Sequence, residues 1–214
     1  MIFTNLIFKT MIHKSLFIVL FCACALVTGA QIQTGTQFVG GGILVSAQKT
    51  PENGNGFQSN YSAVNILPVI GFILNERWAI GSQIGVGFSN QESRNGTQTL
   101  FKSNSKGITM AAVARRYFPL TEKFYLALDG RLQFDRGSEM YSSGTSETTS
   151  QSYEISSIIS PVFIFFPNNR WGFEASIGSI SYGYYRSLST DSSSNNFGLN
   201  YGSVSLGIAY YFQT

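Results

Sequence analysis

The sequence lacks histidine and cysteine over nearly its whole length. Its only histidine, His13, and both cysteines, Cys22 and Cys24, lie within the first 30 of 214 residues. That stretch has the form of a removable leader, so the mature chain would contain neither residue type. Such a chain cannot use Ser-His-Asp or Cys-His catalysis, or build a zinc site from cysteine or histidine. We therefore expect no enzyme, no metal site and no cofactor.

The first 30 residues have the three parts of a secretory signal peptide. Lys9 and Lys14 supply a basic start, residues 15–27 are almost entirely apolar, and residues 28–30 offer small side chains for cleavage. A membrane anchor is the alternative, but the apolar run is shorter than the roughly 20 residues of a spanning helix. We expect a cleaved signal peptide at 1–30 and a mature domain at 31–214.

Two details of this leader stay open. Translation starts at Met1 or at Met11, because either start leaves basic residues ahead of the apolar run. Cys22 and Cys24 raise the alternative of a lipidated cysteine, which the bulky Phe21 before Cys22 disfavours.

Charge is also scarce. Charged residues make up 12% of the chain and aromatic residues 14%, with 22 glycines, a composition that argues against a disordered protein. The net charge is +3, but loss of Lys9 and Lys14 from the 14 basic residues leaves 12 against 11 acidic ones. A nearly neutral chain gives no electrostatic reason to expect a nucleic-acid partner.

Beyond residue 30 the recurrent unit is a strand-like segment rich in β-branched, aromatic and glycine residues, bounded by turn-forming residues. No apolar run there is long enough for a membrane helix. Eight such segments are predicted, at 36–46, 61–73, 78–89, 107–118, 124–136, 152–166, 171–186 and 197–212.

The connections between these segments alternate between long and short. Three are short and turn-like, at 74–77, 119–123 and 167–170, whereas four are long and rich in Ser, Asn, Gly and Thr. This order is expected of antiparallel strands that run up and down with every long loop at one end. Outer-membrane barrels have this asymmetry.

Alternate residues of each segment differ in character, and alternate residues of a strand face opposite sides. In 124–136 one face is large and apolar while the other is small or polar. A soluble β-sandwich strand would alternate in the same way, but the small minor face suits the crowded lumen of an eight-stranded barrel. The apolar face is Phe124, Leu126, Leu128, Leu132 and Phe134; the other is Tyr125, Ala127, Asp129, Arg131, Gln133 and Asp135.

Aromatic residues gather at both ends of the segments, as they do at the two interfaces of a membrane barrel. One predicted belt lies beside the short turns and includes Trp78, Tyr117, Phe166, Trp171 and Tyr211; the other lies beside the long loops and includes Tyr61, Phe88, Phe134, Tyr153, Tyr184 and Tyr185.

Strands in lipid must close into a barrel, because an open edge leaves several unpaired amides without water. Pro68 and Pro161 each remove one donor inside a predicted strand, so an irregularity is expected at both.

Three stretches carry a family resemblance: the glycines at 40–42, the phrase Ala-Arg-Arg-Tyr-Phe-Pro at 114–119, and the closing Leu-Gly-Ile-Ala-Tyr-Tyr-Phe at 206–212. With eight strands and an export signal, the chain resembles the small outer-membrane β-barrel domain proteins related to OmpX and OmpA, a porin-like family. The resemblance implies an all-β fold, a closed antiparallel up-and-down eight-stranded transmembrane barrel in the bacterial outer membrane.

The resemblance also implies a C-terminal signal for the outer-membrane assembly machinery, formed by Gly207, Tyr210 and Phe212. Leu206 stands where that signal usually has a polar residue, and two residues follow Phe212.

The inward-facing charges are the candidate functional residues. We expect Asp129, Arg131, Asp135, Glu174 and Arg115 to form a charge network in the lumen. The network is either a gate for a narrow ion path or a plug of paired charges, and buried charges need partners in both cases. Alternation alone does not decide whether Arg115 or its neighbour Arg116 points inward.

The function expected from these features is that of a monomeric outer-membrane barrel with a side-chain-filled lumen and a structural or loop-mediated interaction role. Its expected partners are outer-membrane lipid and the assembly machinery. Two alternatives stay open: a narrow pore for small solutes, and a secreted soluble barrel that binds an apolar ligand.

Overall fold

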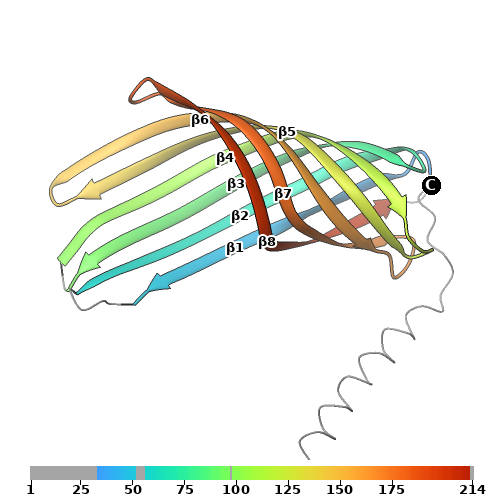
Figure 1. The fold of residues 1–214 in the computed structure, drawn as a ribbon, viewed down its shortest axis with the longest axis horizontal. Helices are drawn as coiled ribbons and strands as arrows, with labels where there is room; N and C mark the ends of the chain where they lie inside the picture. Colours follow the sequence, from blue (N-terminus) through green and yellow to red (C-terminus); the bar gives the residue numbers. More distant parts are fainter. Residues whose placement is uncertain (1–32, 52–55, 97, 213–214) are drawn as a thin grey trace, which may run out of the picture.

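The computed structural model describes residues 33–51, 56–96 and 98–212. Within them the chain forms one closed antiparallel barrel in which each strand pairs with the next and the last with the first (Figure 1). The fold class and the strand number are as predicted; the signal peptide predicted at 1–30 lies outside the described residues. The strands are β1 Gln37–Thr50, β2 Phe57–Asn75, β3 Trp78–Asn95, β4 Gln98–Pro119, β5 Phe124–Ser143, β6 Ser146–Phe165, β7 Trp171–Ser187 and β8 Ser192–Phe212.

The three short turns lie at one end of the barrel, where β8 also ends (Figure 1). Each turn is closed by one side-chain oxygen that accepts two backbone N–H groups, which is the geometry of Asx and Ser/Thr turns. Asn75 Oδ1 accepts from Arg77 and Trp78, and Asn168 Oδ1 accepts from Arg170 and Trp171. Before β5, Thr121 Oγ1 likewise accepts from the backbone N–H groups of Lys123 and Phe124.

At the other end the strands run much further than the sequence predicted. Residues 90–95 and 98–106, predicted as one long polar loop, extend β3 and β4, and residues 137–143 and 146–151 extend β5 and β6. The prediction was wrong because it took polar composition as a sign of a loop. In water both faces of a hairpin can carry Ser, Thr and Asn while the ladder still pairs the backbone.

The large apolar side chains face outward, as predicted for a membrane barrel. Leu128 and Leu132 of β5 are exposed, whereas Ala127 and Asp129, on either side of Leu128, are buried. The same alternation separates exposed Ile84 from buried Gln83 on β3. Since the apolar face lies outside, the arrangement differs from that of a soluble carrier barrel, which would enclose it.

The short-turn end of the lumen is closed by aromatic rings. Phe38 stacks on Tyr211, which meets Phe166 edge-on, and Tyr125 lies edge-on to both Phe166 and Tyr117. All five rings are buried and belong to the main hydrophobic core, together with Ile73, Ala79, Ala127, Val162, Ile164 and Ala209. We call these five rings the aromatic plug.

Three members of the plug correct the sequence analysis. Tyr117, Phe166 and Tyr211 were predicted to form part of the interfacial belt, yet they are at most 3% exposed and point inward. Their parity places them inside, since each alternates with an outward aromatic neighbour, as Tyr211 does with Tyr210 and Phe212. Position near a strand end did not distinguish a belt residue from a plug residue.

The two prolines interrupt their ladders in different ways. Near Pro161 the pairing of β6 with β7 shifts register between Ile159 and Val162, as predicted. Near Pro68 the pairs between β2 and β3 step from Ile66–Val86 to Val69–Gln83 with the register unchanged. Pro68 therefore leaves a local gap in pairing without a bulge.

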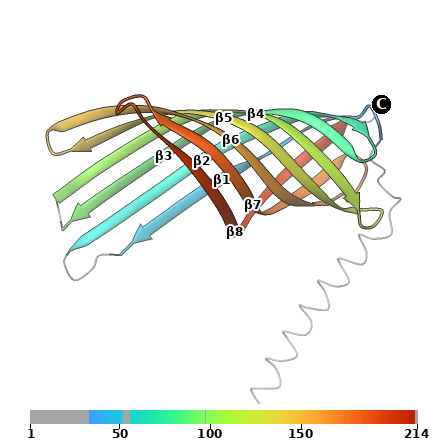
Figure 2. The same ribbon diagram turned by 45° about the horizontal axis from the view of Figure 1, so that its top comes forward.

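The seam between β1 and β8 is the shortest in the barrel. It runs through five residue pairs, from Gln37–Phe212 to Gly41–Ile208, whereas β1 stays paired with β2 as far as Thr50. Beyond Gly41, β8 bends away with β7, as Figures 1 and 2 both show. The bend follows an irregularity between Ile177 and Ser179 that includes Gly178, whose φ is +68°.

No helix in the part of the chain that the structure describes is long and apolar enough to cross a membrane.

Candidate functional site

Arg115 is buried in the lumen beside the aromatic plug, with its guanidinium carbon 5.9 Å from the ring centre of Tyr117. It projects from β4 and makes two-pronged ion pairs with carboxylates of two other strands. Its Nε and Nη2 donate to Asp129 of β5 at 2.6 and 2.9 Å, and its Nη1 and Nη2 donate to Glu174 of β7 at 2.6 and 2.8 Å. Bidentate pairs of this kind fix geometry as well as charge. Arg115 therefore links opposite walls of the barrel.

The other two residues predicted for the network, Arg131 and Asp135, take no part in the ion pairs of Arg115. Arg131 donates from Nη2 to Ser160 Oγ at 3.2 Å and makes no ion pair among the described residues. Asp135 accepts hydrogen bonds from Thr109 and Gln133 further along the lumen. The structure thus brings Arg115, Asp129 and Glu174 together, places Arg131 beside them and keeps Asp135 apart.

Arg116 points outward. Its guanidinium carbon lies 5.5 Å from the ring centre of Trp78 and 5.0 Å from that of Phe118. Both rings belong to the belt beside the short turns, where a cation can reach the membrane interface along an aromatic surface. The inward arginine is therefore Arg115.

A cavity of about 200 Å³ lies beside the charge cluster. Its wall combines the four charged side chains Arg115, Asp129, Arg131 and Glu174 with apolar side chains. Two buried polar atoms in this wall have no hydrogen-bond partner within the described residues: Gln83 Oε1, an acceptor, and Arg131 Nε, a donor. The apolar part of the wall is Phe38, Leu44, Leu67, Val69, Val113 and Val162.

The same cavity reaches the seam where β1 and β8 part. Gly40, Gly41, Gly42, Leu206 and Gly207 line both this cavity and an apolar groove on the outer surface. At Gly41, φ is +136° and a Cβ would lie 2.4 Å from the carbonyl oxygen of Leu67, so only glycine fits there. The outer groove continues past Ile43, Ile66, Pro68, Trp171, Ile208 and Tyr210.

The lumen beyond this level is polar. Tyr61, Asp135, Glu154 and Tyr185 line a second cavity of about 300 Å³ towards the long-loop end. Tyr61 and Tyr185 were predicted to belong to the outer belt; instead they line this cavity. Further out, Ser103 donates a hydrogen bond to Glu139 across the β4–β5 pair.

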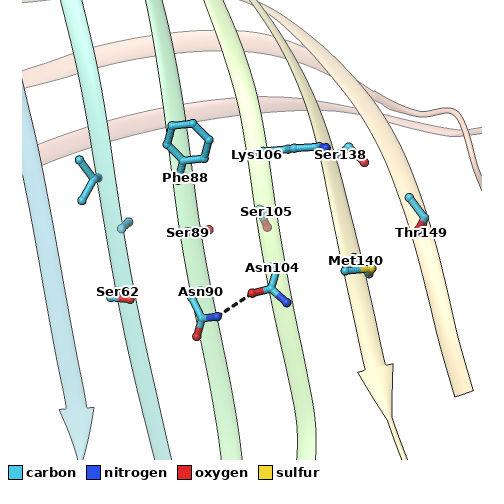
Figure 3. A pocket seen from close by; sticks show the side chains of 12 residues that line it. Ser62, Phe88, Ser89, Asn90, Asn104, Ser105, Lys106, Ser138, Met140 and Thr149 are labelled. Atoms are coloured by element: carbon cyan, nitrogen blue, oxygen red, sulfur yellow. Dashed lines mark hydrogen bonds between the residues drawn. The ribbon is translucent and has the colours of Figure 1, made fainter. Parts of the chain in front are cut away.

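The belt at the long-loop end is present on the outer surface. Phe134 stacks on Tyr153, with ring centres 6.2 Å apart, and Tyr153 neighbours Tyr184 at 6.4 Å. Beside Phe88 of the same belt the surface is hollowed by a groove (Figure 3). There Asn90 donates a hydrogen bond to Asn104 at 2.6 Å, beyond the apolar band.

The C-terminal residues compared with an assembly signal lie on β8. Tyr210 and Phe212 face outward and meet edge-on, with ring centres 5.1 Å apart, and Trp171 packs edge-on against Tyr210. Gly207 pairs with Glu174 of β7. Their role in assembly stays a prediction.

The sequence analysis missed three parts of this site: Gln83, Phe38 and the short β1–β8 seam. Gln83 stood out only as a polar residue on a small-residue face, and nothing in the sequence showed that its oxygen would lack a partner. Phe38 was not singled out, although its even position beside Gly40 and Gly42 places it inside. No signal in the sequence pointed to the short seam, because its length depends on the bend in β8.

Among the described residues, no three His, Cys, Asp or Glu side chains are arranged to hold a metal ion.

No family model matches the chain, and no curated protein matches it. Solved structures that it is similar to include the attachment invasion locus protein Ail of Yersinia pestis, at 15% identity and a TM-score of 0.43, covering 85% of this chain and 100% of that one. A major outer membrane protein from Thermus thermophilus matches at 12% identity and a TM-score of 0.47, with 83% and 99% covered. The outer membrane protein OprG from Pseudomonas aeruginosa matches at 10% identity and a TM-score of 0.43, with 87% and 100% covered.

The closed ring of eight antiparallel strands, the apolar outer face and the two aromatic belts are features of the chain itself. Its fold is that of a small outer-membrane β-barrel, as the resemblance in its sequence predicted.

Proposed function

We propose that this chain is a non-conducting outer-membrane barrel that acts as a structural element and presents extended hairpins at the cell surface. The observation that carries the proposal is the double closure of the lumen. The aromatic plug fills the short-turn end, and the Arg115 cluster spans the lumen beside it. Two successive layers of buried side chains favour a plug over an open path for ions.

The Arg115 cluster, which consists of Arg115, Asp129 and Glu174, forms a charge layer across the lumen. The energetics of this charge layer also favour a lumen that stays closed. Arg115 and Asp129 are 7% and 8% exposed, and all four guanidinium–carboxylate contacts lie between 2.6 and 2.9 Å. Opening the layer would leave buried charges without partners, which is strongly unfavourable. A gate would need an alternative partner for each charge, and Arg131 is the only other cation in the cavity wall among the described residues.

The surface role rests on strand length. A membrane strand needs about 9–11 residues, whereas β4 has 22 residues and β5 and β6 have 20 each. Roughly half of each strand therefore extends beyond the bilayer at the long-loop end. These extensions are rich in Ser, Thr, Asn and Gln and offer hydrogen-bonding surfaces to a partner outside the cell.

Planar-bilayer conductance tests the closed lumen. The wild-type barrel should give no stable discrete openings, whereas the triple variant Phe166→Ala/Tyr211→Ala/Arg115→Ala should conduct because it removes two rings of the plug and the side chain that spans the lumen beside them. Phe165→Ala is the matched control: it lies next to Phe166 but stacks on Phe124, at 4.7 Å.

Unboiled and boiled gel mobility should first show that each variant is still a closed barrel. Stable openings in the wild type would overturn the plugged-barrel proposal and favour the narrow pore. Silence of a correctly folded triple variant would show that the aromatic plug and the Arg115 cluster are not what closes the lumen.

A further inference from the structure

The seam between β1 and β8 ends at Gly41, and beyond it the two strands separate. At this split between the strands the lumen is open towards the lipid. Pairing ends at Gly41–Ile208, and beyond it outward side chains of both edges are strongly exposed, with Val45 at 71% and Leu206 at 71%. Leu44 points to the lumen side yet is still 37% exposed. Beyond Gly42 the barrel wall is therefore open between β1 and β8, both on the side of the lumen and on the outer side.

The inner cavity and the outer groove share wall residues at this split. They share three consecutive glycines of β1 together with Leu206 and Gly207 of β8. The two backbones stay in contact as far as Gly42, where a Cβ would lie 3.2 Å from the carbonyl oxygen of Leu206, so the passage between the two spaces lies beyond Gly42, where β1 and β8 are no longer paired. An elongated molecule can therefore place one end inside the lumen and the other end on the lipid-facing surface.

The inner end of this path contains two buried polar atoms that lack hydrogen-bond partners among the described residues. Gln83 is 6% exposed and its Oε1 lacks a donor, while Arg131 Nε lacks an acceptor, among the residues that the structure describes. A buried polar atom without a partner costs free energy, so a ligand that supplies both partners is stabilised. The cavity wall already balances two cations against two carboxylates, which favours an uncharged head group that offers a donor as well as an acceptor.

The outer end is apolar. Ile43, Ile66 and Pro68 line the groove on the β1–β2 side, and Trp171, Ile208 and Tyr210 line it on the β7–β8 side. Such a surface suits a hydrocarbon chain.

We propose that the cavity beside Arg115 binds the head of a neutral single-chain amphiphile of the monoacylglycerol type, with its acyl chain leaving between β1 and β8 along the outer groove. Gln83 accepts a hydrogen bond from a head-group hydroxyl, and Arg131 donates one to a head-group oxygen. This binding site goes beyond the proposed structural role, and it requires no conduction through the plug.

The two tryptophans of the chain allow a matched test. Trp171 lines the groove, whereas Trp78 lies on β3 against Arg116; both face outward with an exposure of 41%. In lipid nanodiscs, a monoacylglycerol brominated on its chain should quench the single Trp171 of a Trp78→Phe variant saturably. The single Trp78 of a Trp171→Phe variant should be quenched only in proportion to the amount of probe in the bilayer.

Head-group recognition is tested in the Trp78→Phe background. Gln83→Leu and Arg131→Met should each raise the probe concentration for half-maximal quenching by roughly three- to tenfold, the effect of one lost hydrogen bond. Gln91→Leu is the matched control, because Gln91 lies on the same strand outside this cavity.

Three outcomes would overturn the proposal. Identical quenching of Trp171 and Trp78 would mean ordinary contact with bilayer lipid. Saturable quenching that is unchanged by Gln83→Leu and by Arg131→Met would mean binding in the outer groove alone. Tighter binding of a brominated fatty acid anion than of the monoacylglycerol would refute the neutral head group. None of these outcomes bears on conductance, so the structural proposal is tested separately.

Discussion

At the scale of single residues, Arg115 is a buried cation that pairs with two carboxylates. It neutralises two carboxylates from different strands and lies 5.9 Å from the ring centre of Tyr117 in the plug. The charge layer and the aromatic plug are therefore in contact through one side chain.

Replacement of Arg115 by methionine should destabilise the barrel by about 3–5 kcal/mol, because it leaves Asp129 and Glu174 buried and unpaired. Urea unfolding from lipid vesicles, followed by tryptophan fluorescence, measures the loss. The triple variant Arg115→Met/Asp129→Asn/Glu174→Gln should recover a large part of it, since no charge then stays unpaired. If the single variant is as stable as the wild type, the charge layer does not hold the walls together.

Which face a residue takes was the most predictable feature of the sequence. Alternation correctly placed Leu128, Leu132 and Ile84 outside and Asp129 inside. It did not separate Arg115 from Arg116, because both lie near a strand end, where an arginine can reach either the lumen or the interface. The partner of Arg115 on β7 depends on barrel curvature, which no local pattern records.

At the scale of elements, β5 crosses two environments along one outward face. Leu132 lies in the apolar band, whereas Met140 lies eight positions further on, in the extension beyond the belt at Phe134 and Tyr153. Both side chains are exposed, at 60% and 42%. Their difference in surroundings comes only from the solvent that they meet.

Leu132→Arg should therefore cost roughly 2–4 kcal/mol, the penalty of arginine near the bilayer midplane. Met140→Arg should cost almost nothing, because its side chain meets water. Unfolding from vesicles gives both values. Equal costs would mean that the bilayer does not end between these two positions.

The hairpin of β5 and β6 should tolerate shortening. Removal of Glu139–Ser142 together with Glu147–Ser150 would join Ser138 to Ser143 and Ser146 to Gln151, which keeps the Ser138–Gln151 register. The shortened barrel should still show a mobility shift between unboiled and boiled gel samples, since the deleted part lies outside the bilayer. Loss of the shift would show that the extension stabilises the closed ring.

The elements were predictable in number, order and turn position, but not in length. Strong signals marked the short turns, where Asn75, Thr121 and Asn168 close the backbone. At the long-loop end the sequence is polar on both faces, and neither periodicity nor turn residues marks where a strand ends. The ends there are set by hairpin pairing, which the sequence shows only weakly.

At the scale of the whole molecule, the seams of the ring differ in length. The β5–β6 ladder extends from Phe124–Phe165 to Ser143–Ser146, whereas β1 and β8 meet only below Gly41. Unpaired amides exchange with solvent faster than amides in a ladder. Hydrogen exchange should therefore be faster at the alternate amides of residues 43–50 that point away from β2 than in residues 37–41, where β1 is paired on both sides. Equal protection of the two segments would show that the upper part of β1 has a partner in the membrane.

The short seam also bears on how the ring is made. Every other ladder joins strands that are neighbours in sequence and can zip from a turn, but the seam joins Gln37 to Phe212, nearly the two ends of the described chain. Closing so long a loop carries the largest entropic cost and yields the fewest backbone pairs in return. We therefore expect ring closure to be the last event in folding and the first to reverse, so the barrel can come open along one line while seven hairpin ladders stay intact.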